Sequence, residues 1–149
     1  MEVGVIAMKE ERTSGAAFIG LAHGAIMSAR ALDDTRIEQR LQQLIAERRR
    51  RSAHFNANLF SDPAWDILLV LALADTRQQR LTVTKLCRRI DTPMTTALRW
   101  IGTLTEQGHV LRRDDVTDKR RKYIELSPGA SAAMRHYCTA ESPSLALVA

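Results

Sequence analysis

From residue 33 to residue 108, apolar residues recur every three or four positions, which is the spacing of one helix face. The first such stretch predicts a long helix over residues 33–55, with Asp33 or Asp34 as its N-cap. Its apolar stripe is narrow and consists of Ile37, Leu41, Leu44 and Ile45. A narrow stripe is typical of a helix that packs along a partner, so we expect homodimerisation here. The alternative is packing over Ile67 to Leu73 of the same chain.

Two further helices follow a short connector. Asp62 and Pro63 form an N-cap followed by proline at the first helical position, and residues 64–74 are apolar almost throughout. We therefore expect this helix at the centre of the core. After a polar loop, Thr82 is expected to cap the next helix, whose apolar face consists of Val83, Leu86, Cys87 and Ile90.

Thr92 and Pro93 repeat the cap-plus-proline signal and predict another helix, which Gly108 ends as a left-handed cap. The buried face of this helix is expected to consist of Ala97, Trp100, Ile101 and Leu104, with Trp100 as a core anchor rather than a platform for stacked bases.

Beyond Gly108 the apolar period falls to two, which predicts a β-hairpin from His109 to Leu126 around a polar tip at residues 114–120. Ser127 is expected to cap a last short helix over about residues 129–139. The predicted fold is mainly α with a two-stranded β-hairpin. This order of elements is that of a winged helix-turn-helix domain, which we expect over residues 62–140. Residues 1–32 are predicted to be a mobile segment or a poorly packed helix, and residues 141–149 a tail.

Several classes of protein lack support in these 149 residues. No apolar run reaches the ~18 residues of a membrane span, so we expect a cytoplasmic protein without a membrane partner. Cys87 and Cys138 are far apart and predicted to be reduced, and the four histidines have no ligand spacing, so neither a metal nor a cofactor is expected. A Ser/His/Asp set, a phosphate-binding glycine loop and paired carboxylates in an apolar setting are all missing, which argues against an enzyme.

The positive charge of the chain is concentrated in one segment. The whole sequence carries +5, but residues 77–122 contain twelve Lys or Arg and five acids, a net of +7, so the remainder carries −2. Such asymmetry indicates a surface for a polyanion, with a merely solvated basic face as the alternative. The run Arg48 to Arg51 is read as a solvated helix end, with phosphate contact as the alternative.

The helix that begins at Pro93 is expected to have a polar face exposed to solvent. With its apolar face buried, it leaves Thr95, Thr96, Arg99 and Thr103 pointing outward. An α-helix fits the major groove of DNA, where Arg can contact guanine and Thr offers a hydroxyl and a methyl group. The hairpin tip adds Lys119, Arg120 and Arg121, which suit the minor groove. Double-stranded DNA is therefore the expected partner.

At this point the residues resemble the MarR (multiple antibiotic resistance regulator) family over roughly residues 62–130. The resemblance rests on residues 81–86, on the stretch from Pro93 to Gly108, and above all on the hairpin. There Asp118, Arg120, Leu126 and Ser127 match the wing pattern D-x-R-x-x-x-x-x-L-[ST]. The resemblance implies a dimeric transcription regulator in which Asp118 braces the wing, Arg120 enters the minor groove and Ser127 caps the next helix.

The expected DNA-binding set is Thr95, Thr96, Arg99, Thr103, Arg112, Arg113, Lys119, Arg120 and Arg121. The competing hypothesis is a winged helix that serves only as a protein-interaction module, its basic face meeting an acidic partner. The residues do not indicate an effector ligand.

Overall fold

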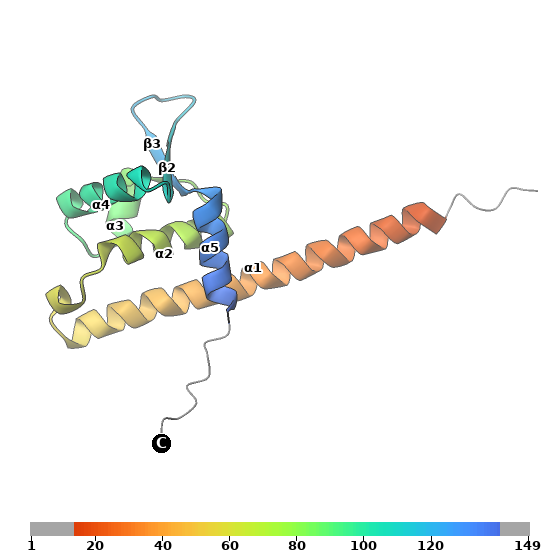
Figure 1. Ribbon diagram of the computed structural model, residues 1–149, viewed down its shortest axis with the longest axis horizontal. Helices are drawn as coiled ribbons and strands as arrows, with labels where there is room; N and C mark the ends of the chain where they lie inside the picture. The colour runs from red at the N-terminus through yellow and green to blue at the C-terminus, as the bar shows by residue number, and fades with distance from the viewer. Residues whose placement is uncertain (1–13, 141–149) are drawn as a thin grey trace, which may run out of the picture. The chain divides into compact units, whose positions relative to one another are not determined.

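A computed structural model describes the backbone of residues 14–140 and the side chains of residues 23–140. The chain divides into two compact units, residues 1–34 and 35–149. Along the chain (Figure 1) the elements are α1 (Ser14–His54), the 3-10 helix η1 (Ala57–Phe60), α2 (Pro63–Thr76), β1 (Leu81–Thr82), α3 (Val83–Arg89), α4 (Met94–Glu106), β2 (Val110–Asp114), β3 (Lys122–Leu126) and α5 (Pro128–Thr139). Helices α3 and α4 followed by a hairpin form a winged helix-turn-helix, which confirms the predicted fold class.

The start of α1 differs from the prediction. The helix begins at Ser14, and Asp33 and Asp34 lie within it, so neither residue is an N-cap. The intervening sequence is rich in Ala and contains no Pro, and nothing in it therefore breaks a helix. Of the two readings of residues 1–32, the helix is observed from residue 14 onward. Residues 1–13 and the predicted tail at 141–149 lie outside the described residues.

Helix α2 forms the centre of the core, as its apolar sequence predicts. Ile67, Leu69 and Leu71 expose at most 2% of their surface. The side chain of Asp62 accepts a hydrogen bond from the backbone N–H of Trp65 at 3.2 Å, and Pro63 occupies the first turn. In Figure 1, α2 lies between α4 and the C-terminal half of α1.

The apolar stripe of α1 packs within its own chain. Ile37 and Leu41 are buried in the same cluster as α2, and Leu44 and Ile45 pack against that cluster. For this stripe the structure shows the intramolecular alternative, because the chain itself already covers its surface. A stripe of four residues cannot distinguish the two kinds of packing in the sequence.

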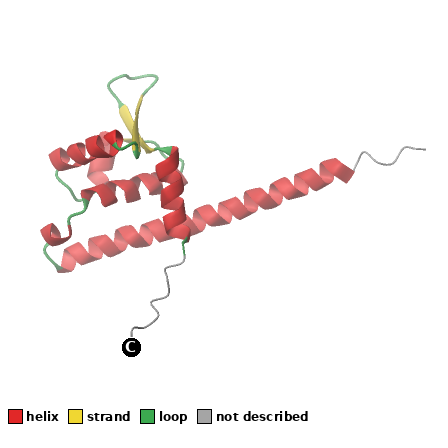
Figure 2. Ribbon diagram, in the orientation of Figure 1, coloured by secondary structure: helices red, strands yellow, loops and turns green. Residues whose placement is uncertain are grey.

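The sheet has three strands rather than the two that were predicted. Its order is β1-β3-β2, all antiparallel, and Leu81 of β1 pairs with Ile124 of β3. Figure 2 shows the β2-β3 hairpin in yellow. Strand β1 contains only two residues, too few to show an alternating pattern. Both Leu81 and Ile124 are 2% exposed, so this extra pairing joins the wing to the core.

Local hydrogen bonds fix the start of α3 and α5 and the end of α4 at the residues that the sequence predicts. Thr82 and Ser127 accept bonds from the backbone N–H groups of Lys85 and Ala130. Gly108 has a φ of +75°, and its neighbour His109 donates to the carbonyl of Leu104 at 2.9 Å, which is a Schellman ending for α4.

The start of α4 is an exception. Its N-cap is Pro93, which has no side-chain acceptor, and not Thr92. The prediction of Thr92 as the cap is therefore wrong by one residue.

Burial of Leu41 predicts a large effect of its truncation. Leu41→Ala should lower the free energy of unfolding by about 2–5 kcal/mol, because it leaves a cavity against α2. Leu59→Ala is the matched control, since Leu59 is 71% exposed, and should change stability by less than about 0.5 kcal/mol. Urea unfolding monitored by circular dichroism measures both. Equal effects of the two substitutions would contradict packing of α1 on the core.

Candidate nucleic-acid interface

Helix α4 has one buried and one exposed face. Ala97 and Ile101 are fully buried, whereas Thr95 and Arg99 are exposed. Thr96 and Thr103 are half-buried, and the hydroxyl of Thr103 donates to the carbonyl of Arg99 at 3.3 Å. The four predicted side chains therefore differ in availability, and Thr95 and Arg99 are the most accessible.

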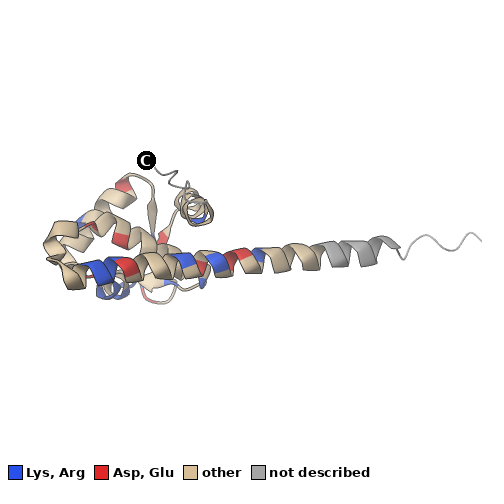
Figure 3. Cartoon of the chain, turned by 90° about the horizontal axis from the view of Figure 1, so that it is seen from below, with Lys and Arg blue, Asp and Glu red and all other residues tan. Residues whose placement is uncertain are grey.

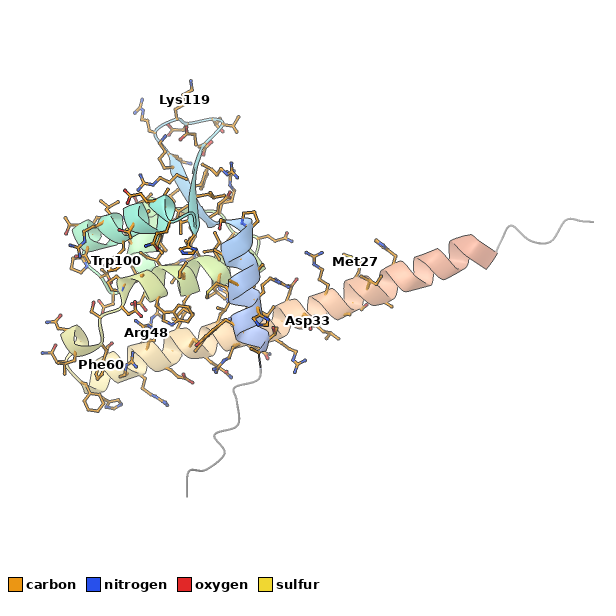
Figure 4. All side chains as sticks on the ribbon, in the orientation of Figure 1. Met27, Asp33, Arg48, Phe60, Trp100 and Lys119 are labelled. Carbon is orange, nitrogen blue, oxygen red and sulfur yellow. The ribbon has the colours of Figure 1, made fainter. Side chains whose placement is uncertain are left out.

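Other residues of α4 depart from the expected pattern. Trp100 is half-buried and packs against the edge of the core rather than within it (Figure 4). Met94 and Leu98 expose 45% and 43% of their surface beside the predicted polar residues. Met94 was not anticipated as part of this face, although it lies one turn before Leu98. The exposed face of α4 thus offers apolar contacts as well as polar ones.

The wing is a hairpin whose two arginines on β2 face opposite ways. Arg112 pairs with Ile124 and Arg113 with Tyr123, and adjacent residues of a strand point to opposite faces. Both arginines are exposed. The connecting loop carries Lys119 at its tip (Figure 4) and Arg120 beside it, both exposed.

Some of the basic wing residues already have acidic partners. Arg113 Nε lies 2.7 Å from Glu125 Oε1, Arg121 Nε lies 3.8 Å from Asp118 Oδ2, and Lys122 pairs with Asp114. The side chains of Arg113 and Arg121 remain 57% and 65% exposed. Exposed pairs of this kind contribute little stability, so an incoming anion can replace either carboxylate at small cost.

Other cations of the same region have no carboxylate within 4 Å among the described residues. They are exposed and lie on three elements and the loop: Lys85 and Arg88 on α3, Arg99 on α4, Arg112 on β2, and Lys119 and Arg120 in the loop. Figure 1 shows α4 and the loop on the far side of α2 from the C-terminal half of α1. Along α1, by contrast, acids are interspersed with basic residues up to Glu47, before the run Arg48 to Arg51 (Figure 3).

Asp115 organises the wing loop, and sequence reasoning missed it. Its carboxylate accepts hydrogen bonds from the N–H groups of Thr117 at 2.8 Å and Asp118 at 3.4 Å, and from the hydroxyl of Tyr123 at 2.9 Å. The Thr117 N–H and then the Tyr123 hydroxyl lower the pKa of Asp115 to about 2. The signal available in the sequence was an Asp two residues before Thr, the spacing of an Asx turn.

Asp118 and Tyr123 support the same loop. Asp118 accepts a hydrogen bond at 3.0 Å from the backbone N–H of Arg120, the residue that the resemblance places in the minor groove. Tyr123 lies under the wing, with the guanidinium of Arg80 4.1 Å from its ring centroid. The loop is thus held from its base by two carboxylates and one aromatic ring.

Other chemistry receives no support from the described residues. Among them, no three His, Cys, Asp or Glu side chains are grouped as a metal site would need. Burial raises the pKa of both Cys87 and Cys138, which keeps these thiols protonated. No helix in the described part of the chain has the length and apolarity for a membrane crossing.

Comparisons with known proteins give matches among solved structures alone: no family model and no curated protein matches the sequence. One match is apo MarR from E. coli, with 18% identity, 78% of this chain and 72% of that chain covered, and a TM-score of 0.44. A MarR mutant from E. coli complexed with operator DNA matches at 19% identity, 82% and 73% coverage, and a TM-score of 0.44.

The adhesin competence repressor AdcR from Streptococcus pyogenes matches at 25% identity, 48% and 55% coverage, and a TM-score of 0.39. A ZitR mutant from Lactococcus lactis matches at 19% identity over 54% of this chain, with a TM-score of 0.46. The alignment spans only 51% of the ZitR chain and 55% of the AdcR chain.

The bond from Tyr123 predicts the titration of Asp115. Tyr123→Phe removes one donor to the carboxylate, so the pKa of Asp115 should rise from about 2 toward the unfolded value of 3.8. In the native wing, the stabilisation from the ionised carboxylate is complete above 3.8 and is lost as the pH falls toward 2. Carboxyl-carbon NMR titration measures the shift.

Tyr137→Phe is the matched control for that titration, because Tyr137 is an exposed phenol that packs edge-to-face against Trp65. This variant should leave the titration of Asp115 unchanged. An unaltered pKa in Tyr123→Phe as well would show that the phenol does not bond to Asp115 in solution.

Proposed function

We propose that this chain is a sequence-specific double-stranded DNA-binding transcription regulator of the MarR type. The observation that carries the proposal is the group of unpaired cations on α3, α4, β2 and the wing loop; of these, α4 and the loop lie on the far side of α2 from the C-terminal half of α1 (Figure 1). Cations without carboxylate partners repel one another in the free protein, and phosphates relieve that repulsion. The pattern therefore favours a polyanion over a solvated face.

Helix α4 inserts into the major groove in this proposal. Arg99 is exposed near the middle of the helix and can donate two parallel hydrogen bonds to guanine. Thr95, one turn earlier on the same face, contacts the neighbouring base pair. Thr96 and Thr103, which are half-buried, flank these contacts at the groove edge.

The wing contacts the flanking minor groove. Arg120 and Lys119 enter or border the groove, because their loop is held by Asp115 and Asp118 while their side chains remain exposed. Arg112, Arg113 and Arg121 contact phosphates, the latter two after exchanging their carboxylate partners. Only Arg99 and the threonines of α4 would then read base identity directly.

The protein acts as a homodimer in this proposal, but through a different surface from the buried stripe. Within the first unit, Ile26, Met27 and Leu32 expose 66%, 55% and 67% of their surface on α1. Large apolar side chains that are exposed on a helix are stabilised when packing removes them from water. A second copy supplies that packing, and two recognition helices then read half-sites about 10 base pairs apart.

Replacing Arg99 should affect specific binding alone. Arg99→Ala is expected to cost about 1–3 kcal/mol of affinity for a duplex site selected from a random library, and to relax preference at one base position. Fluorescence anisotropy with selected and scrambled duplexes measures the difference. An equal loss on both duplexes would mean that Arg99 contacts phosphate only.

Arg120→Ala is the contrasting variant in the same assay. It should weaken both duplexes with little change in major-groove preference and reduce the slope of log K against log salt by about one phosphate. Arg36→Ala on α1 is the control with the same charge loss and should change neither quantity. Wild-type protein that binds all duplexes weakly at every salt concentration would instead favour a protein-interaction module.

Sedimentation equilibrium tests the dimer. At tens of micromolar the full chain should sediment at twice its 16.7 kDa, and Ile26→Glu combined with Leu32→Glu should give a folded monomer. Val116→Glu is the control, because Val116 is an exposed apolar residue of the wing. A monomeric wild-type protein that binds a single half-site would contradict the dimer.

A further inference from the structure

The basic run Arg48 to Arg51 has a structural arrangement that neither sequence reading anticipated. The side chain of Arg48 is only 18% exposed, and its Nε lies 2.5 Å from Asp66 Oδ1 in the first turn of α2. Its Nη2 also donates to the backbone carbonyl of Asp62 at 3.3 Å. Arg48 is thus joined to the N-terminal end of α2 (Figure 4) rather than solvated.

Arg49 is joined to a different helix. Its Nη2 donates to the carbonyl of Arg89 at 3.2 Å, and Arg89 is the last residue of α3. The last carbonyls of any helix lack partners within the helix, and a cation there also interacts favourably with the helix dipole. The guanidinium of Arg49 therefore satisfies the C-terminal end of α3 from a position 40 residues earlier in the chain.

Few other polar contacts hold the turn between α3 and α4. Within the described residues, Pro93 begins α4 without a side-chain cap, so that end of the turn has no local polar anchor. Ile90 anchors the turn by burial, with 7% of its surface exposed. The turn before α4 is therefore held by burial of Ile90 and by the bond from α1 at Arg89, in addition to the buried face of α4 itself.

We propose that Arg48 and Arg49 are positioning residues that hold α2 and α3 against α1 and thereby set the placement of α4 for DNA binding. Consecutive residues of a helix point about 100° apart, so two adjacent arginines can reach two different helices. Neighbouring members of the run do not share the role. Arg49 and Arg50 are both exposed, but within the described residues only Arg49 of the two bonds to another helix, and Arg51 lies over the Phe60 ring at 4.7 Å. This inference rests on the proposed function.

Arg49→Met tests the role, because it keeps the length of the side chain and removes the donor. Arg50→Met is the matched control, with the same charge loss one residue away. In DNA-free protein, amide hydrogen exchange at the end of α3 and at Ala97 should become about tenfold faster in Arg49→Met, the effect of one lost hydrogen bond, and stay unchanged in Arg50→Met. Arg49→Lys, which can still donate to the Arg89 carbonyl, should restore part of the protection.

DNA binding supplies the second readout. Arg49→Met should reduce affinity for a selected duplex about tenfold more than for a scrambled one, with the salt slope unchanged, because a misplaced α4 loses base contacts and not phosphates. A salt slope lowered by about 0.9 with unchanged exchange would make Arg49 a phosphate contact and overturn the proposal. Unchanged exchange and unchanged affinity would overturn it as well.

The exchange measurement does not require DNA, so the two proposals can fail separately. Faster exchange in Arg49→Met together with a wild-type protein that binds no duplex would support the positioning of α4 and overturn the proposed function.

Discussion

Burial of α2 on all sides is the constraint on which the rest of this structure depends. Its apolar residues face α4, the sheet, α5 and the stripe of α1 at once, and each of these elements covers part of the same surface. A helix with so little polar surface cannot remain at the edge of a soluble domain. Helix α4, the wing and the C-terminal half of α1 therefore all pack around one central element.

Carboxylates in the wing pair with some of its basic residues and so reduce the repulsion between positive charges. Concentrating cations on one side costs repulsion, and the wing limits that cost by pairing Arg113, Arg121 and Lys122 with carboxylates that stay exposed. Asp115 acts differently, because it bonds mostly to backbone N–H groups and shapes the loop itself. The wing thus has a rigid base and exchangeable side chains, an arrangement that suits contact with phosphates.

Polar contacts from α1 add a second link to the helix-turn-helix. The stripe around Leu41 joins α1 to the core by apolar packing, while Arg48 and Arg49 bond to the ends of α2 and α3. The C-terminal half of α1 thus contacts the helices before α4 through both apolar packing and hydrogen bonds. The same helix carries the exposed apolar residues that the proposed dimer would cover.

Local patterns in the sequence determined helices α2 to α5, the β2-β3 hairpin, the caps at Asp62, Thr82 and Ser127, the left-handed Gly108 and the exposure of Arg99, because each depends on residues within one or two turns. Contacts between residues distant in the chain were decided only by the tertiary structure. Strand β1 is defined by its pairing with β3 and not by its own two residues. The sequence alone did not decide whether the stripe of α1 and the arginines after it contact another molecule or the same chain. In the structure they contact the core, α2 and α3. Arg48 and Arg49 bond to residues 18 and 40 positions later in the chain. Such pairs produce no periodic pattern in the sequence, because tertiary packing and not local spacing brings them together.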